Sequence, residues 1–178
     1  MINEIKNYDQ SFLETNFLSN VDHIIMLLIN GISDRNLSNV KHYLPSNIYN
    51  KFNDLINDYK NKKIIRKFDE ANIKSSEILH YSINNDIINN KGKVITRYMD
   101  YFNDENGNYI NGENQRRLEN EKIIVVSKRL NNIEIDGIIR CKNCGHSLDI
   151  SSSNICNYCK ETFDMIDYSY IISEIDLF

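Results

Sequence analysis

Apolar residues in the first third of the chain recur every three to four positions, which is the spacing of one face of an α-helix. Ser11 and Glu14 have the spacing of a capping box at the start of this run, and Gly31 and Asp34 mark its end. The sequence therefore predicts a long amphipathic helix in this region. Its expected buried positions are Phe12, Phe17, Leu18, Val21, Ile24, Ile25, Leu28 and Ile32.

A second helical pattern follows Pro45, whose ring disfavours a helical conformation in the residue before it. Ser46 is the predicted N-cap of this helix, because its hydroxyl group can accept a hydrogen bond from a free backbone N–H. A shorter helix is expected before the proline, over Leu37 to Tyr43. The apolar side of the helix after the proline is formed by Ile48, Tyr49, Phe52, Leu55, Ile56 and Tyr59.

From about Ile73 onward the pattern changes to runs rich in Val, Ile, Thr and Tyr, which are typical of β-strands. Residues 90–92, with the sequence Asn-Lys-Gly, are expected to interrupt one of these runs. Two Asn-Gly pairs, at residues 106–107 and 111–112, predict tight turns. The expected strands are residues 73–83, 93–102 and 121–130, and residues 163–175 are expected to pair with the sheet or pack against it.

Helices followed by antiparallel strands indicate an α+β domain in which the helices cover one face of a curved antiparallel sheet. We expect this domain to span residues 1–137, which is enough chain to bury a hydrophobic core. The remaining residues, 138–178, are expected to form a small zinc ribbon and a C-terminal segment that packs back on the sheet.

Composition narrows the class of protein. The chain has 178 residues and a formal net charge of -4, and its C-terminal part has no net basic face, so nucleic acid is not an expected partner. The longest apolar run, Ile24 to Ile29, is six residues long, whereas a membrane-spanning helix needs about 20. The first residues lack the basic and apolar stretches of a secretion signal. A cytoplasmic protein is therefore expected.

The four cysteines provide the most specific chemical signal. Cys141 and Cys144 form one Cys-x-x-Cys pair, and Cys156 and Cys159 form a second, with eleven residues between the pairs. This spacing predicts a structural site with one Zn²⁺ per chain, because each pair directs two thiolates at one centre. Four thiolates leave no open position for a catalytic water, and we interpret His146 as a surface residue and not as a competing ligand.

Disulfides and redox chemistry are the alternatives for these cysteines. Two disulfides require an oxidising compartment, for which the chain shows no secretion signal. A redox-active Cys-x-x-Cys motif usually occurs as a single copy at a strand-to-helix junction, whereas this chain has two copies.

Few polar residues are candidates for chemistry inside the domain. We expect Tyr43, Tyr98, Asp100 and Tyr101 near a cavity, where Asp100 would be a general base and a tyrosine would donate a hydrogen bond. Alternatively, these tyrosines are core residues whose hydroxyl groups reach water. Because the sequence offers no convergent set of acids and bases, catalysis is not expected.

One basic cluster follows the second long helical pattern. It contains Lys62, Lys63, Arg66 and Lys67. Positive charge at the end of a helix usually compensates the helix dipole and stays solvated. The alternative is a contact with anionic lipid or with an acidic partner, to which each charge would contribute about 1 kcal/mol.

Several motifs are distributed over nearly the whole chain. The start of the first helix contains Asp9-Gln10-Ser11-Phe12 and then Phe17-Leu18, and the second long helix is entered through Leu44-Pro45-Ser46-Asn47-Ile48-Tyr49. The expected hairpin contains Asp100-Tyr101, Gly107 and Ile110-Asn111-Gly112, and Lys128-Arg129 ends the last long strand. The C-terminal part contains Cys141-Lys142-Asn143-Cys144 and Cys156-Asn157-Tyr158-Cys159. Together these motifs resemble bacterial Tim44-like domains with a C-terminal zinc ribbon, which are relatives of the membrane-anchor subunit of the mitochondrial import motor.

The resemblance implies a cone similar to nuclear transport factor two, in which helices close over a bent antiparallel sheet and a pocket lies inside. It implies a noncatalytic binding or scaffold protein that serves as an adaptor for a protein partner, with a link to membranes or protein transport. The alternative is a small-molecule carrier or an enzyme that uses the cavity of the cone. The chain lacks the Trp, the N-terminal membrane segment and the Gly-rich stretch of many relatives, so we expect peripheral membrane contact at most.

Overall fold

The computed structural model describes residues 5–8, 12–130, 140–149, 154–176 and 178. Four strands form one antiparallel sheet in the order β1-β2-β3-β4, and two long helices pack against it, which confirms the α+β class. The elements are α2 (Glu14–Ser33), η1 (Lys41–Tyr43), α3 (Ser46–Asn61), β1 (Ile64–Asn84), β2 (Ile87–Asp104), β3 (Tyr109–Arg129), η2 (Met165–Asp167) and β4 (Ile171–Ile175).

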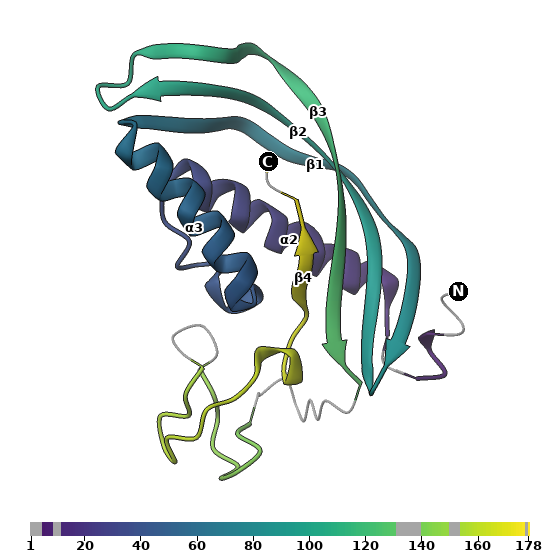
Figure 1. Cartoon of the computed structure of the whole chain (residues 1–178). Coiled ribbons are helices and arrows are strands. Elements are labelled where there is room, and N and C mark those ends of the chain that lie inside the picture. Colours follow the sequence, from purple (N-terminus) through teal and green to yellow (C-terminus); the bar gives the residue numbers. More distant parts are fainter. Residues whose placement is uncertain (1–4, 9–11, 131–139, 150–153, 177) are drawn as a thin grey trace.

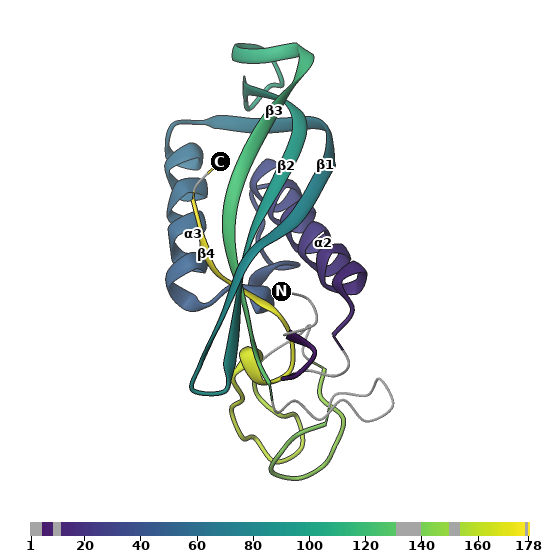
Figure 2. The same cartoon turned by 90° about the vertical axis from the view of Figure 1, so that its right-hand side faces the viewer.

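The three long strands bend together, so that the sheet arches over the helices (Figure 1). Both α2 and α3 lie on the concave side of this arch, and β4 lies on the same side, next to α3 (Figure 2). An extra residue in one of two paired strands bends the pair and increases its twist. The pairing of β1 with β2 has three such shifts in register, which follow Asp69, Ile73 and Ile78.

The hydrophobic core lies between the concave face of the sheet and the two helices. Ile25 and Leu28 of α2 and Phe52 of α3 are fully buried, and they belong to the same apolar cluster as Tyr98 of β2 and Ile124 of β3. The helical spacing read from the sequence therefore identified the buried faces correctly. Three of the expected core residues are only partly buried, namely Leu18, Tyr49 and Leu55.

The ends of the helices differ in detail from the predictions. α2 begins at Glu14 after Leu13, whose side chain cannot cap it, and Ser11 lies outside the described residues. The prediction that Ser46 caps the second long helix is wrong: Pro45 holds the N-cap position with φ -64° and ψ 158°, and Ser46 is already helical. Before Pro45, only one turn of 3₁₀ helix forms, at η1.

The strands are longer than their sequence pattern indicated. β1 already begins at Ile64, whereas the predicted strand begins at residue 73. The spacing of apolar residues therefore did not predict the first part of β1. Residues 90–92 do not interrupt β2, because Gly92 sits between two paired strands, where an added Cβ would lie 3.2 Å from the carbonyl oxygen of Glu77. The hairpin turn instead lies at Asn85 and Asp86, which both have positive φ.

The two Asn-Gly pairs have different roles. The first pair forms the predicted turn between β2 and β3, where Gly107 has φ +87° and its N–H donates to the carbonyl oxygen of Asp104. The prediction of a turn at the second pair is wrong, because Gly112 lies inside β3 opposite Tyr101. Gly112 has φ +109°, and an added Cβ would lie 2.5 Å from the carbonyl oxygen of Asp100. This glycine therefore permits close contact between two strands, not a reversal of the chain.

The last strand returns the C-terminal part of the chain to the sheet. β4 pairs with β3 in a register that joins Ile124 to Ile175 and Ser127 to Ile171. The expected boundary between residues 137 and 138 lies outside the described residues. Within the described part of the chain, neither long helix is apolar enough over a sufficient length to cross a membrane.

Candidate metal centre

Two similar turns hold the four cysteines. In the first turn, the N–H of Cys141 donates to the carbonyl oxygen of His146 at 2.8 Å, and the N–H of Gly145 donates to the carbonyl oxygen of Cys141 at 2.8 Å. Gly145 directly follows Cys144 and has φ +74°, in the left-handed region that glycine adopts without a steric penalty. This conformation closes the turn, so that both sulfur atoms face the same side.

The second turn repeats this hydrogen-bond pattern with different side chains. The N–H of Cys156 donates to the carbonyl oxygen of Glu161 at 2.8 Å, and the N–H of Lys160 donates to that of Cys156 at 2.9 Å. Lys160, after Cys159, has φ +64° at the position equivalent to Gly145. A lysine in this conformation is uncommon, so the closed turn is maintained despite its local cost.

The two turns face each other and bring all four sulfur atoms together. The Sγ atoms of Cys141 and Cys159 are 3.7 Å apart, as are those of Cys144 and Cys156, and all four lie within 4.8 Å of one another. All four cysteines are free. Metal–sulfur bonds of about 2.3 Å in a regular tetrahedron require sulfur atoms about 3.8 Å apart, so the donor set fits one tetrahedral metal ion.

The electrostatics of the cluster also fit a cation. A hydrogen bond from the backbone N–H of Glu161 lowers the pKa of Cys159 to about 6. The backbone N–H of His146 lowers the pKa of Cys144, but desolvation and the other three sulfur atoms outweigh it and raise that pKa to about 12. A bound divalent metal ion would supply the positive charge that keeps four neighbouring cysteines in the thiolate form.

The ring of His146 lies outside the group of metal-binding atoms. It stacks on the ring of Tyr158, with the ring centroids 3.5 Å apart and the planes inclined by 12°. Both residues are exposed, and His146 is not part of the cluster of potential ligands. The position of this side chain agrees with its interpretation as a surface residue.

A charged bridge joins the cysteine turns to the sheet. Asp167 of η2 accepts from Arg129 Nε at 2.5 Å and lies 3.1 Å from Lys142 Nζ, beside the first cysteine. Arg129 also binds the carboxylate of Asp86 in the β1–β2 turn. The backbone N–H of Lys142 donates to the hydroxyl oxygen of Tyr168 at 3.3 Å. The cysteine turns are thus fastened to the end of β3 and to the segment that leads into β4.

Two of the four residues expected near a cavity face the interior of the arch. Tyr98 is 1% exposed and packs against the ring of Phe68, and burial is the main reason that its pKa is raised to about 12. Arg66 binds both oxygen atoms of the Asp100 carboxylate, at 2.9 and 2.7 Å. These polar groups therefore belong to the packing of the core and to one ion pair.

The other two expected residues make separate contacts. The ring of Tyr43 lies against that of His42, with centroids 4.1 Å apart, and the hydroxyl group of Tyr101 donates to the carboxylate of Asp69 at 2.5 Å. The four residues are therefore not assembled around one site.

The structure also separates the members of the basic cluster. Lys62 ends α3 and pairs with Asp58 at 2.7 Å, and Lys63 follows it on the surface with φ +55°. Lys67 is half-buried in β1. Arg66 points into the arch, where its side chain is 12% exposed. Of the four residues, Lys62 and Lys63 alone are exposed.

Comparison with known protein families agrees with the arrangement of helices and strands described above. The family model of the Tim44-like domain matches residues 1–136, which include both long helices and β1 to β3. The chain belongs to the Tim44-like domain family. No curated protein matches the chain. The family match ends before the four cysteines, so the candidate metal centre lies outside the matched residues.

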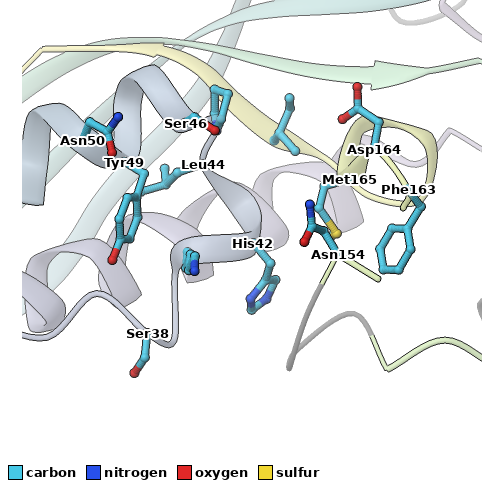
Figure 3. A pocket seen from close by; sticks show the side chains of 13 residues that line it. Ser38, His42, Leu44, Ser46, Tyr49, Asn50, Asn154, Phe163, Asp164 and Met165 are labelled. Carbon is cyan, nitrogen blue, oxygen red and sulfur yellow. The ribbon is translucent and has the colours of Figure 1, made fainter. Parts of the chain in front are cut away.

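A hollow of about 780 Å³ lies between the Tim44-like domain and the cysteine turns. Figure 3 shows His42 and Tyr49 on one side of it, and Phe163 and Met165 on the other. None of the four residues expected near a cavity lines this hollow. The Nδ1 atom of His42 is buried and has no hydrogen-bond partner among the described residues, and burial lowers its pKa.

Sequence reasoning did not identify the residues that attach the cysteine turns to the Tim44-like domain. Asp167 is 38 residues from Arg129 and 25 residues from Lys142, so no local motif joins them. The only available signal was Arg129 at the end of the last long strand. Arg66 was grouped with surface lysines because β1 was predicted to begin later than it does.

Proposed function

We propose that this Tim44-like protein is a noncatalytic binding or scaffold protein, stabilised by one structural zinc ion, that serves as an adaptor for a protein partner. The bent sheet with two helices on its concave side supports the cone of nuclear transport factor two as its architecture. In this proposal, the arch and its edges provide the binding surface, and the cysteine turns fix the C-terminal strand.

The noncatalytic part of the proposal rests on one observation, the ion pair between Asp100 and Arg66. A general base needs a carboxylate that can approach a substrate proton. Here Arg66 binds both carboxylate oxygens, and Tyr98 is buried and stays protonated because its pKa is about 12. An ion pair of this kind holds β1 to β2 and offers no acid–base couple to a substrate.

The chemistry of the donor set supports zinc. Cys141, Cys144, Cys156 and Cys159 supply four soft thiolates in tetrahedral arrangement, the ligand set of structural zinc sites. A closed site of this type stabilises local structure and leaves no coordination position for a reacting water. Elemental analysis and native mass spectrometry of protein purified without chelator should find one zinc per chain, and a chain that carries no metal would contradict this part.

The adaptor role is tested by crosslinking in the native cell followed by affinity purification, with membrane and soluble fractions analysed separately. We expect specific proteins to be enriched, above all proteins of membranes or of protein transport. Recovery of the protein without any crosslinked partner in either fraction would contradict the proposal.

Contact with an anionic membrane is part of the proposed role and is supported by Lys62 and Lys63, which are exposed side by side after α3. Two such charges contribute about 1 kcal/mol each near an anionic surface, so the contact would be weak and sensitive to salt.

A small-molecule carrier is the second candidate, and the hollow beside His42 is the observation that favours it. Its volume of about 780 Å³ lies in the range of ligand sites, and His42, whose buried Nδ1 atom has no hydrogen-bond partner among the described residues, lines it. Native mass spectrometry should then detect a bound molecule that is lost in a His42→Ala variant. Identical spectra of the two proteins would exclude this candidate.

A further inference from the structure

We propose that the groove between α3 and the edge of β3 is a binding site for an extended, acidic polypeptide segment with an aromatic side chain, and that the protein's own Ile175, Asp176 and Phe178 fill it until a partner segment displaces them. This inference rests on the proposed role as a protein adaptor and names the site where the partner would bind.

The chain's own segment shows how a ligand would be held. Lys51 of α3 donates to the carbonyl oxygen of Ile175 at 3.1 Å, and Arg66 of β1 donates to the carbonyl oxygen of Phe178 at 2.7 Å. Both side chains donate to backbone oxygen atoms, which every polypeptide has. These contacts therefore select an extended backbone and not this particular sequence.

An aromatic side chain completes the recognition. The ring centroid of Phe178 lies 6.2 Å from that of Phe52 and 6.0 Å from that of Phe68, and Lys122 Nζ lies 5.0 Å above the ring of Phe178. Aromatic pairs and cation–π contacts at these separations are attractive. Phe178 nevertheless keeps part of its surface exposed, so another ring could take its place.

The charges around this position favour an acidic segment. Lys51, Arg66 and Lys122 each contact the chain's own segment, so three cations surround it, and Asp100 and Asp176 act on Lys122 with the opposite charge. Burial, together with the two neighbouring cations, lowers the pKa of Lys122. An acidic group supplied by a ligand would relieve this repulsion, as Asp176 does at present.

The edge of β3 offers more room than the chain's own segment uses. β4 is five residues long and pairs with β3 only between Ile124 and Ser127. Within the described residues, the rest of β3, from Tyr109 to Ile123, has no strand on this side. A hollow of about 360 Å³ adjoins the end of β4, and Ile123, which is 39% exposed, lines it.

These features explain how a partner segment could displace the chain's own C-terminal segment. Figure 1 shows the C-terminal end under the arch. A partner segment could form the same backbone and ring contacts and also add hydrogen bonds along the free edge of β3, which Ile175 and the residues after it do not make. An incoming segment that pairs with more of the strand would therefore compete successfully.

The test uses the full chain and a labelled synthetic peptide with the sequence of residues 171–178. Fluorescence anisotropy would measure binding of this peptide to the wild-type protein and to the variants Phe178→Ala and Asp176→Lys. Both substitutions remove contacts that keep the chain's own segment in the groove, namely the ring contacts of Phe178 and the negative charge of Asp176. We expect each variant to bind the peptide at least tenfold more tightly than the wild-type protein does, and the binding to weaken as salt is raised.

Matched controls make the result specific. Tyr158→Ala removes an exposed ring from the cysteine turns and should leave peptide affinity at the wild-type level. A peptide in which the phenylalanine is replaced by alanine should bind the Phe178→Ala protein at least tenfold more weakly. Equal affinity of the wild-type and variant proteins, or equal affinity of the two peptides, would overturn the proposal.

The two proposals fail in different ways. If crosslinking finds a protein partner while the peptide does not bind to either variant, the adaptor role stands and this groove is not its site. If the peptide binds as expected while no partner is found in the cell, the groove is real and the adaptor role fails.

Discussion

Asn90 is a polar residue in the core whose side chain has no hydrogen-bond partner among the described residues. It is 0% exposed, and neither its Oδ1 nor its Nδ2 atom is paired, whereas its neighbour Asn89 accepts a hydrogen bond from Ser127 Oγ at 2.6 Å. A buried amide without a partner costs about 1–3 kcal/mol, while a formed hydrogen bond contributes about 1 kcal/mol. Two adjacent asparagines of β2 thus have opposite effects on stability.

The first prediction compares these two residues. Asn90→Leu should raise the free energy of unfolding by about 1 kcal/mol, because a hydrocarbon side chain of similar size replaces an unpaired amide. Asn89→Leu should lower it by about 1 kcal/mol, because the Ser127 hydroxyl group loses one of its two side-chain partners, Asn89 and Ser173. Urea denaturation of the three proteins gives both values. A loss of stability in Asn90→Leu equal to that in Asn89→Leu would contradict the prediction.

The second prediction concerns two glycines with positive φ. Gly112→Ala should lower the free energy of unfolding by about 3 kcal/mol, because its Cβ would overlap the backbone at Asp100 and Tyr101 in addition to the strained φ. Gly107→Ala also has a positive φ, of +87°, but an added Cβ would meet nothing within 4 Å, so it should cost about 1 kcal/mol. Thermal and urea unfolding measure the difference, and similar costs at both positions would argue against the close strand contact.

At the scale of elements, the η2 turn connects the cysteine turns to the sheet through a single carboxylate. Asp167 contacts Arg129 at the end of β3 and Lys142 in the first cysteine turn. β4 begins four residues after Asp167, so the position of this strand depends on the same contact. The contacts of Asp167 therefore couple the position of the cysteine turns to the position of β4.

The third prediction follows from the pKa of Asp167. Burial raises this pKa, but Arg129 and Lys142 outweigh the effect and lower it below the ordinary value of about 3.9. Because the folded-state pKa is depressed, Asp167 stabilises the fold above its unfolded pKa, and this contribution is lost as the pH falls through the folded value. A carboxyl NMR titration should place its midpoint below the ordinary value and show an upward shift in Arg129→Gln. An unshifted midpoint in that variant would mean that the ion pair is not formed.

At the scale of the whole molecule, the protein combines two parts with different sources of stability. The Tim44-like domain buries an apolar core between its helices and the sheet. The cysteine turns are small and contain few fully buried apolar side chains, so a metal ion, which can contribute on the order of 10 kcal/mol, would hold them together. The two parts should therefore respond differently to removal of metal.

The fourth prediction uses this difference. A chelator, or the substitution Cys144→Ser, should accelerate amide hydrogen exchange in residues 140–149 and 154–176, including β4. Exchange in α2, β1 and β2 should stay slow, because their core does not involve the cysteines. His146→Ala should behave as the wild-type protein. Loss of protection in α2 along with the cysteine turns would show that the parts unfold together.

The fifth prediction concerns the membrane. Flotation with anionic vesicles at low salt should recover the protein, and Lys62→Glu combined with Lys63→Glu should abolish this binding. Arg66→Lys should leave flotation unchanged, because Arg66 points under the arch. Absence of flotation for the wild-type protein at low salt would rule out the lipid contact.

The sequence by itself determined the parts of the fold that depend on local patterns. Apolar residues at helical spacing identified both long helices and their buried faces, and the paired Cys-x-x-Cys motifs correctly predicted that the four cysteines cluster. These predictions succeeded because the physical cause, a repeating apolar face or a turn that directs two sulfur atoms, is contained within a few neighbouring residues.

Only the tertiary structure decided the features that depend on distant residues. The first part of β1 lacks a strand pattern and is extended because it pairs with β2, and Gly112 lies in a strand because Asp100 and Tyr101 pass close to it. Arg66 became an interior residue because Asp100, 34 residues away, supplies its partner, and Phe178 reaches it from 112 residues away. Sequence spacing cannot indicate such contacts, because folding of the sheet over the helices brings these residues together.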